Sequence, residues 1–200
     1  MKIKSLVILI IVVIVIVGGV YGAMVIRRGF SARDNPSWLE SSLAKKARGM
    51  AVPSAAKNLK NPVANTQENL KEGEEHWADH CAVCHANNGS GDTTIGKNLY
   101  PKAPDMRKPD TQGMTDGELY YTIENGIRLS GMPAWGPGGD NDEASWKLVL
   151  FIRHLPKLTP EEEKHMQSLN PKSPEEKSEE QEEQEFLKGQ STPAKKPPHH

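Results

Sequence analysis

The clearest pattern in the chain is an uncharged apolar run from Leu6 to Ile26. A helix needs about 20 apolar residues to cross the hydrocarbon core of a bilayer, and this run has that length. Helices that are apolar on every side are rare in soluble proteins. The apolar part of a cleaved signal peptide is shorter, about 7–15 residues, and small residues follow it, whereas Tyr21 lies there in this chain. The pattern predicts one uncleaved transmembrane anchor over residues 6–26, after a short N-terminal segment, residues 1–5.

The next segment, residues 27–65, is polar and basic. Ser37 and Glu40 have the spacing of a helix N-cap and its reciprocal partner. Apolar residues then share one face of a helix expected over residues 38–50, and cations lie off that face. Such a helix is suited to lie on a membrane surface and bind anionic headgroups, and a solvated spacer explains the pattern equally well. The proline, alanine and asparagine content of residues 51–65 favours a flexible tether.

Helical spacing returns in residues 66–156, which we expect to form the folded domain. Asn65 and Glu68 offer the start of a first helix, which should run on toward residue 80. Gly73 lies inside this helix, where glycine costs about 1 kcal/mol relative to alanine and therefore has a packing reason. We expect a second helix, residues 144–155, to cross closely at that glycine.

The segment between these two helices shows no strand-like alternation. Thr115 and Glu118 form a second capping box and open a helix that should end near Gly126. The residues after 156 are rich in glutamate, lysine, proline and serine and contain few apolar residues. The fold class is therefore all-α, followed by an acidic tail, residues 157–200, that we expect to be disordered.

Charge divides the chain in the same places. Counting lysine and arginine against aspartate and glutamate gives +2 for residues 1–26, +6 for 27–65, −6 for 66–155 and −3 for 156–200, which together give the net charge of −1. This asymmetry predicts an acidic folded domain next to a basic membrane-proximal segment.

The two cysteines of the chain, Cys81 and Cys84, are followed directly by His85. Cys-x-x-Cys-His is the attachment sequence of a c-type haem, in which both thiols are linked to the haem and the histidine is the proximal iron ligand. A zinc site would need two further ligands; His76 and His80 are available, but they fit solvated helix residues better. A thioredoxin-like redox pair should follow a strand, and a helical run precedes this motif. The motif predicts one covalently attached haem c.

A second axial ligand is expected from a methionine. Met132 lies between glycine and proline residues that would hold its loop against the haem, and thioether sulfur is a soft ligand that raises the reduction potential of the iron. Met106 and Met114 are the alternatives, and a lone methionine usually fills gaps in a core. We therefore predict that His85 and Met132 bind the iron.

The segment from Glu68 to Leu155 resembles the class I monohaem cytochromes c. The resemblance is carried by Gly73 and Trp77 ahead of Cys81–His85, Gly89–Asp92, Pro101, Pro104, Thr115–Leu119, Asn125–Ile127, Gly131–Trp135, Trp146 and Phe151–Leu155.

The resemblance implies a small all-α cytochrome c fold around one haem, with one haem edge exposed. It also implies that the first and last helices cross at Gly73 and that His85 and Met132 are the axial ligands. A carbonyl of the proline region, for which Pro101 is the expected residue, would accept the N–H of His85. Ala86 departs from the family, which usually has glycine there, and this puts a tight turn in question.

Together these features predict an electron-transfer protein that is not an enzyme. Haem is attached to thiols outside the cytoplasm, so the haem domain should lie on the periplasmic side of a bacterial inner membrane. The protein would carry single electrons in a respiratory chain, between a quinol-oxidising complex or dehydrogenase and a terminal oxidase or reductase. Its redox partners should have a basic docking patch, and we expect no nucleic acid and no small-molecule substrate at the iron.

Two alternatives remain. The first is a fixed haem subunit of a larger membrane oxidoreductase. The second, less favoured, is a haem sensor or peroxidase-like enzyme, which would need an open iron site.

Overall fold

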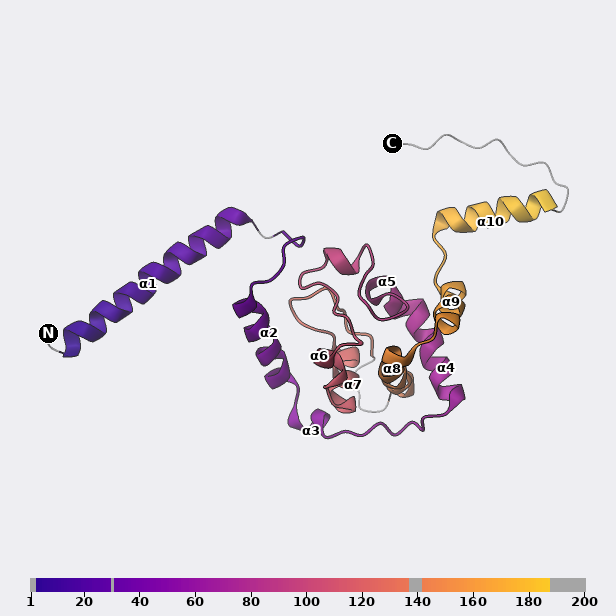
Figure 1. The fold of residues 1–200 in the computed structure, drawn as a ribbon, viewed down its shortest axis with the longest axis horizontal. Coiled ribbons are helices and arrows are strands. Elements are labelled where there is room, and N and C mark those ends of the chain that lie inside the picture. Colours follow the sequence, from indigo (N-terminus) through magenta and orange to yellow (C-terminus); the bar gives the residue numbers. More distant parts are fainter. Residues whose placement is uncertain (1–2, 30, 137–141, 188–200) are drawn as a thin grey trace.

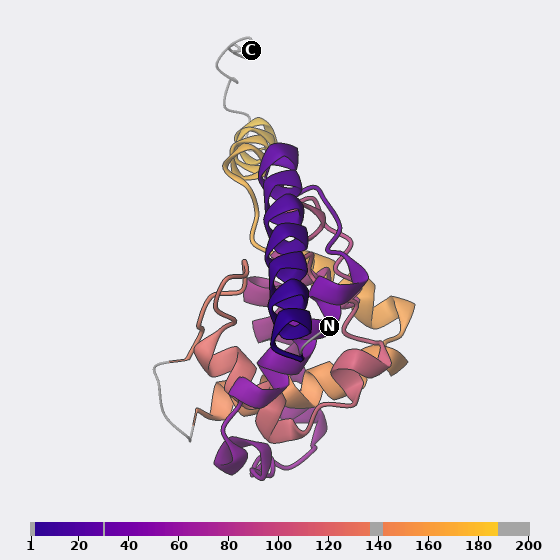
Figure 2. The same ribbon diagram turned by 90° about the vertical axis from the view of Figure 1, so that its left-hand side faces the viewer.

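A computed structural model describes residues 3–29, 31–136 and 142–187 of the chain. Within these ranges the structure consists of helices and loops without a strand, as the sequence predicted. Helix α1 (Ile3–Arg28) projects away from the other helices (Figure 1) and lies in front of them when viewed from its own side (Figure 2). It has no buried residue, and it is long and apolar enough to cross a membrane. The predicted anchor is thus a candidate membrane span that extends slightly beyond residues 6–26.

The centre of the domain is the crossing of α4 (Gln67–His76) and α8 (Glu143–His154). A Cβ atom at Gly73 would collide with the carbonyl oxygen of Lys147 on α8, so the predicted close crossing at this glycine is confirmed. Trp77 and Phe151 pack beside it, with ring centroids 5.6 Å apart. The start of α4 differs from the prediction by one residue, because the hydroxyl of Thr66, and not the side chain of Asn65, accepts the Asn69 N–H.

Helix α7 (Asp116–Asn125) completes this core. It begins with the predicted capping box of Thr115 and Glu118 and ends at Gly126, which has a φ of +64°. Tyr120 stacks on Trp146 of α8 with ring centroids 4.1 Å apart. Two short helical segments, η2 (Gly96–Asn98) and α6 (Pro109–Gln112), lie in the long connection that leads to α7.

Residues 52–61 of the basic segment contact the domain, which corrects the prediction that residues 51–65 form a flexible tether. Helix α2 (Trp38–Ala51) agrees with the helix expected over residues 38–50, and a further helix, α3 (Ser54–Lys57), lies against α7. Val52 is buried, and a side chain at Gly117 would collide with the Ala56 carbonyl. The Asn61 amide donates to the Trp146 carbonyl at 3.0 Å. These contacts join residues far apart in the sequence, and composition could not reveal them.

The predicted disorder of the tail is wrong for the helix that follows the core. Helix α9 (Pro160–Leu169) packs on α4 and on the π-helical turn η1 (Trp77–Cys81), and the Met166 side chain is fully buried. A ring nitrogen of His165 lies 3.0 Å from a carboxylate oxygen of Glu74 on α4. Leu169 also packs against the core, and a ring nitrogen of His154 on α8 lies 3.0 Å from the Glu162 carboxylate, so apolar and polar contacts together dock α9. Helix α10 (Pro174–Leu187) follows, and residues 188–200 of the predicted tail lie outside the described residues.

Candidate haem-binding site

The Cys-x-x-Cys-His motif follows the C-terminal end of α4. Cys81 is the last residue of the π-helical turn η1, and Cys84 and His85 follow on the short helix α5 (Ala82–His85). Single π-helical turns are rare and often occur at functional sites. The turn places both thiols on one continuous helical segment, as haem attachment requires.

The two thiols are free and are poorly suited to thiol–disulfide chemistry. Burial raises the pKa of the Cys81 thiol to about 12, and the nearby Cys84 adds to this shift. Burial also raises the pKa of the Cys84 thiol. A thiol–disulfide enzyme needs a thiolate near neutral pH. The site therefore favours cysteines that carry a covalent group over a redox-active pair.

The His85 side chain is half-buried, with its ring centroid 5.8 Å from that of Trp77. Burial lowers the pKa of His85 and favours the neutral imidazole, the form that binds metals, although a backbone contact from Pro104 opposes the shift. The Pro104 carbonyl is the acceptor near the His85 ring. The contact falls short of full hydrogen-bond geometry at Nδ1. The sequence led us to expect Pro101, and the structure corrects this to Pro104. Such an acceptor orients a ligating ring.

The backbone folds tightly around the residue that follows the motif. The indole N–H of Trp77 donates to the Ala86 carbonyl at 3.1 Å, and the Gly91 N–H donates to the His85 carbonyl at 2.8 Å. Gly96 packs so closely on the motif that a Cβ there would collide with the Cys84 carbonyl. Ala86 itself has φ 62° and ψ 159°, a region that is essentially restricted to glycine. The turn questioned in the sequence is therefore present, with alanine in a strained conformation.

Replacing Ala86 with glycine should stabilise the protein. Relief of this backbone strain, about 1–3 kcal/mol, exceeds the conformational entropy cost of glycine, about 0.5–1 kcal/mol. We expect a net gain of about 1 kcal/mol, measured by thermal unfolding of the haem-loaded protein. Ala82→Gly is the matched control: Ala82 is buried and helical, so the same chemical change should be destabilising there. A melting temperature for Ala86→Gly at or below that of the parent would contradict the strain.

The loop that carries Met132 is fixed to the end of α7 by backbone hydrogen bonds. The Met132 carbonyl accepts from Ile127 N–H at 3.1 Å, and the Trp135 N–H donates to the Ile123 carbonyl at 3.1 Å. The Trp135 ring meets His80 edge to face, with centroids 5.5 Å apart, so the loop lies beside the helical segment that leads into Cys81.

The alternative methionines have other surroundings. Met106 is a buried member of the hydrophobic core, and Met114 packs against that core. Met132 is only half-buried and is not part of the core cluster. Met106 and Met114 therefore have packing roles of their own, whereas the structure provides no such role for Met132.

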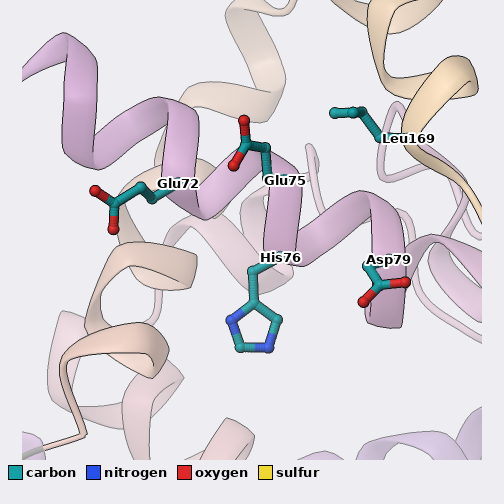
Figure 3. Close-up of a pocket in the computed structure, with 5 residues that line it drawn as sticks. All are labelled: Glu72, Glu75, His76, Asp79 and Leu169. Carbon is teal, nitrogen blue, oxygen red and sulfur yellow. The ribbon is translucent and has the colours of Figure 1, made fainter.

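The residues considered for a zinc site are His76, at the end of α4, and His80, on the turn η1. Figure 3 shows Glu72, Glu75, His76 and Asp79 around a shallow hollow, with Leu169 of α9 at its edge. The His76 and His80 rings lie edge to face, with centroids 4.9 Å apart. Among the described residues, no three histidine, cysteine or acidic side chains gather closely enough to hold a metal ion. The hollow is thus an acidic surface beside the motif.

The imidazole of His85 and the two adjacent thiols fit the attachment and ligation of haem c. Among the described residues, four buried side-chain polar atoms make no full hydrogen bond: His85 Nδ1, Trp146 Nε1 and both carboxylate oxygens of Glu124. The sequence indicated only a packing role for Trp146, because an unpaired N–H can be recognised only when the neighbouring atoms are known.

Comparison with known proteins agrees with this chemistry. The model of the family described as cytochrome c oxidase, cbb3-type, subunit III matches residues 68–152. No curated protein matches the chain. An apolar helix that fits a membrane anchor lies N-terminal to the matched residues. Residues 68–152 therefore form a c-type cytochrome domain of the class I kind, which implies covalently bound haem c and a role in electron transfer.

Proposed function

We propose that this protein is a membrane-tethered cytochrome c that carries single electrons in a respiratory chain. Its donor would be a quinol-oxidising complex or a dehydrogenase, and its acceptor a terminal oxidase or reductase. The observation that supports this most is the placement of Cys81, Cys84 and His85, all half-buried, on one continuous helical segment inside a cytochrome c domain. Bound there, haem c supplies a one-electron iron couple.

The side chains of this chain would attach, orient and shield that group. Cys81 and Cys84 would hold it covalently, and His85 and Met132 would ligate its iron. Trp77 and the Pro104 carbonyl would orient the His85 ring. With the iron ligated by two side chains of the protein, no substrate would bind there. The residues therefore support electron transfer in place of catalysis.

The domain would lie on the periplasmic side of a bacterial inner membrane, with residues 1–5 in the cytoplasm, because haem is attached to thiols outside the cytoplasm. The domain, residues 66–155, has a net charge of −6. Carboxylates beside the motif, among them Glu75 and Asp79, lie on its surface (Figure 3). A partner with a basic patch would dock there, and electron transfer should slow as the salt concentration rises.

A second candidate is a fixed haem subunit of a larger membrane oxidoreductase. Two observations favour it: the matching family is described by an oxidase subunit, and residues 38–65 contact the domain at several points. The connection between α1 and α2 is residues 29–37, and a coil of nine residues would reach about 17 Å, against about 35 Å for a tether of about 40 residues. A short connection limits how far the domain can swing.

A potentiometric titration followed by optical spectroscopy tests the proposal. We expect one reversible one-electron transition, six-coordinate spectra in both oxidation states and no rapid binding of carbon monoxide to the reduced protein. Rapid binding of carbon monoxide would instead identify an open iron site and favour a sensor or a peroxidase-like enzyme. Solubilisation in mild detergent separates the two electron-transfer candidates, since a fixed subunit co-purifies with its complex and a free carrier does not.

A further inference from the structure

The apolar face of α2 points away from the domain. Its large apolar side chains, Trp38, Leu39, Leu43 and Met50, are each more than half exposed. Leu39, Leu43 and Met50 fall on one face at helical spacing. A surface helix normally buries such a face against its own protein. In α2 this face is left open.

Polar side chains of α2 contact the domain. Lys45 forms an ion pair with Asp110 of α6 at 2.5 Å, and the Tyr100 hydroxyl donates to the Glu40 carboxylate at 2.5 Å. The hydrogen bond to Glu40 raises the pKa of Tyr100 to about 12. Beyond the end of α2, the buried Val52 continues the attachment. The helix is thus fixed to the domain while its apolar side faces outward.

Position and charge indicate what covers the apolar side. Helix α2 begins ten residues after the end of α1, the candidate membrane span, so the chain keeps it near the bilayer surface. The segment from residue 27 to 65 has a net charge of +6. Lys46 lies at the edge of the apolar face, and Arg27 and Arg28 end α1. Anionic headgroups attract lysine and arginine with about 1 kcal/mol each.

We infer that α2 lies in the headgroup region of an anionic phospholipid bilayer, with Leu39, Leu43 and Met50 turned toward the acyl chains. Because Glu40 and Lys45 of α2 also contact the domain, α2 holds the cytochrome domain against the membrane in one orientation. The inference rests on the part of the proposed function that makes α1 a membrane anchor, and it does not depend on the haem chemistry.

The test measures the access of water-soluble reagents to α2 in protein-free bilayers. Full-length, haem-loaded protein with Leu43→Cys is reconstituted into vesicles of phosphatidylcholine and phosphatidylglycerol and treated with a water-soluble maleimide. The matched control is Lys164→Cys, an exposed position on α9, and the parent protein is the blank. We expect the thiol at position 43 to react about tenfold more slowly than the control in these vesicles, which corresponds to burial of one aliphatic side chain. In detergent solution, and with the further substitution Lys46→Glu in the Leu43→Cys protein, the thiols at positions 43 and 164 should react at equal rates.

Equal labelling rates at positions 43 and 164 in the anionic vesicles would overturn the inference. Protection that occurs in native membranes but not in protein-free vesicles would also overturn it, and would assign the apolar face to a protein partner. An alkaline wash identifies a failure of the anchor: if α1 does not span the bilayer, the protein leaves the vesicles, and the inference is lost together with the anchor.

Discussion

A variant with alanine at both Cys81 and Cys84 is expected to lose the fold of the cytochrome domain. A domain of about 90 residues buries little apolar surface, and a covalently held macrocycle would complete its core. The total stability of a small domain is only about 5–15 kcal/mol, so losing the covalently held part of the core should leave the polypeptide unfolded. Backbone hydrogen exchange in α8 should therefore change from slow to nearly unprotected.

Hydrogen exchange is the suitable measurement because α1 stays helical in detergent whether or not the domain folds. Val83→Ala is the matched control: Val83 lies between the two cysteines and is exposed, so its truncation keeps both thiols and should leave α8 protected. Protection of α8 in the double alanine variant equal to that of Val83→Ala would show that the polypeptide folds without haem.

Replacing Met132 with alanine should lower the reduction potential and open the iron to external ligands. A methionine opposite histidine raises the potential of haem iron, and axial ligands together span about 0.8 V. We expect a decrease on the order of 0.1 V or more, with carbon monoxide now binding rapidly to the reduced protein. The measurement is a potentiometric titration of the purified, full-length variant.

Met106→Leu and Met114→Leu serve as controls for the loss of a thioether elsewhere. Both side chains belong to or pack against the core, and leucine has a similar volume, so the potential should change little. If Met132→Ala keeps the potential of the parent while Met106→Leu or Met114→Leu lowers it, the second ligand is one of the core methionines.

The features that could be predicted from the sequence are those that local spacing determines. The capping box of Thr115 and Glu118 specifies the start of α7 because both hydrogen bonds lie within four residues. The crossing at Gly73 was also predictable, since a glycine inside an apolar helix face has few roles other than close packing. The haem motif is likewise contiguous.

The features that were missed depend on contacts between distant parts of the chain. Residues 51–65 have the composition of a tether, yet the side-chain amide of Asn61 donates a hydrogen bond to the Trp146 carbonyl. The tail has the composition of a disordered segment, yet Met166 enters the core beside α4. In each case one or two side chains outweigh the average polarity of the segment. The average composition of a segment does not predict such contacts.

Details of the site were missed for a related reason. The choice of Pro104 in place of Pro101 depends on how the loop after the motif folds back. The strain at Ala86 was foreseen only as a departure from a family pattern, and its size follows from the backbone angles. The unpaired N–H of Trp146 requires knowledge of every neighbouring atom.

The packed linker changes how electron transfer should work in this protein. Because only nine residues, 29–37, separate α1 from α2, the haem domain would remain close to the bilayer surface. A carrier with so short a connection exchanges electrons with membrane complexes directly beside it, and tethering raises their effective concentration. Long-range movement between distant complexes would need diffusion of the whole protein in the membrane.

The mass of the intact mature protein tests the central claim most directly. If Cys81 and Cys84 carry haem c, denaturing mass spectrometry of protein made with a haem-attachment system should give the polypeptide mass plus that of one haem. The added mass should persist after acid–acetone extraction, because thioether bonds survive it. A mass equal to that of the amino acids alone would contradict the account.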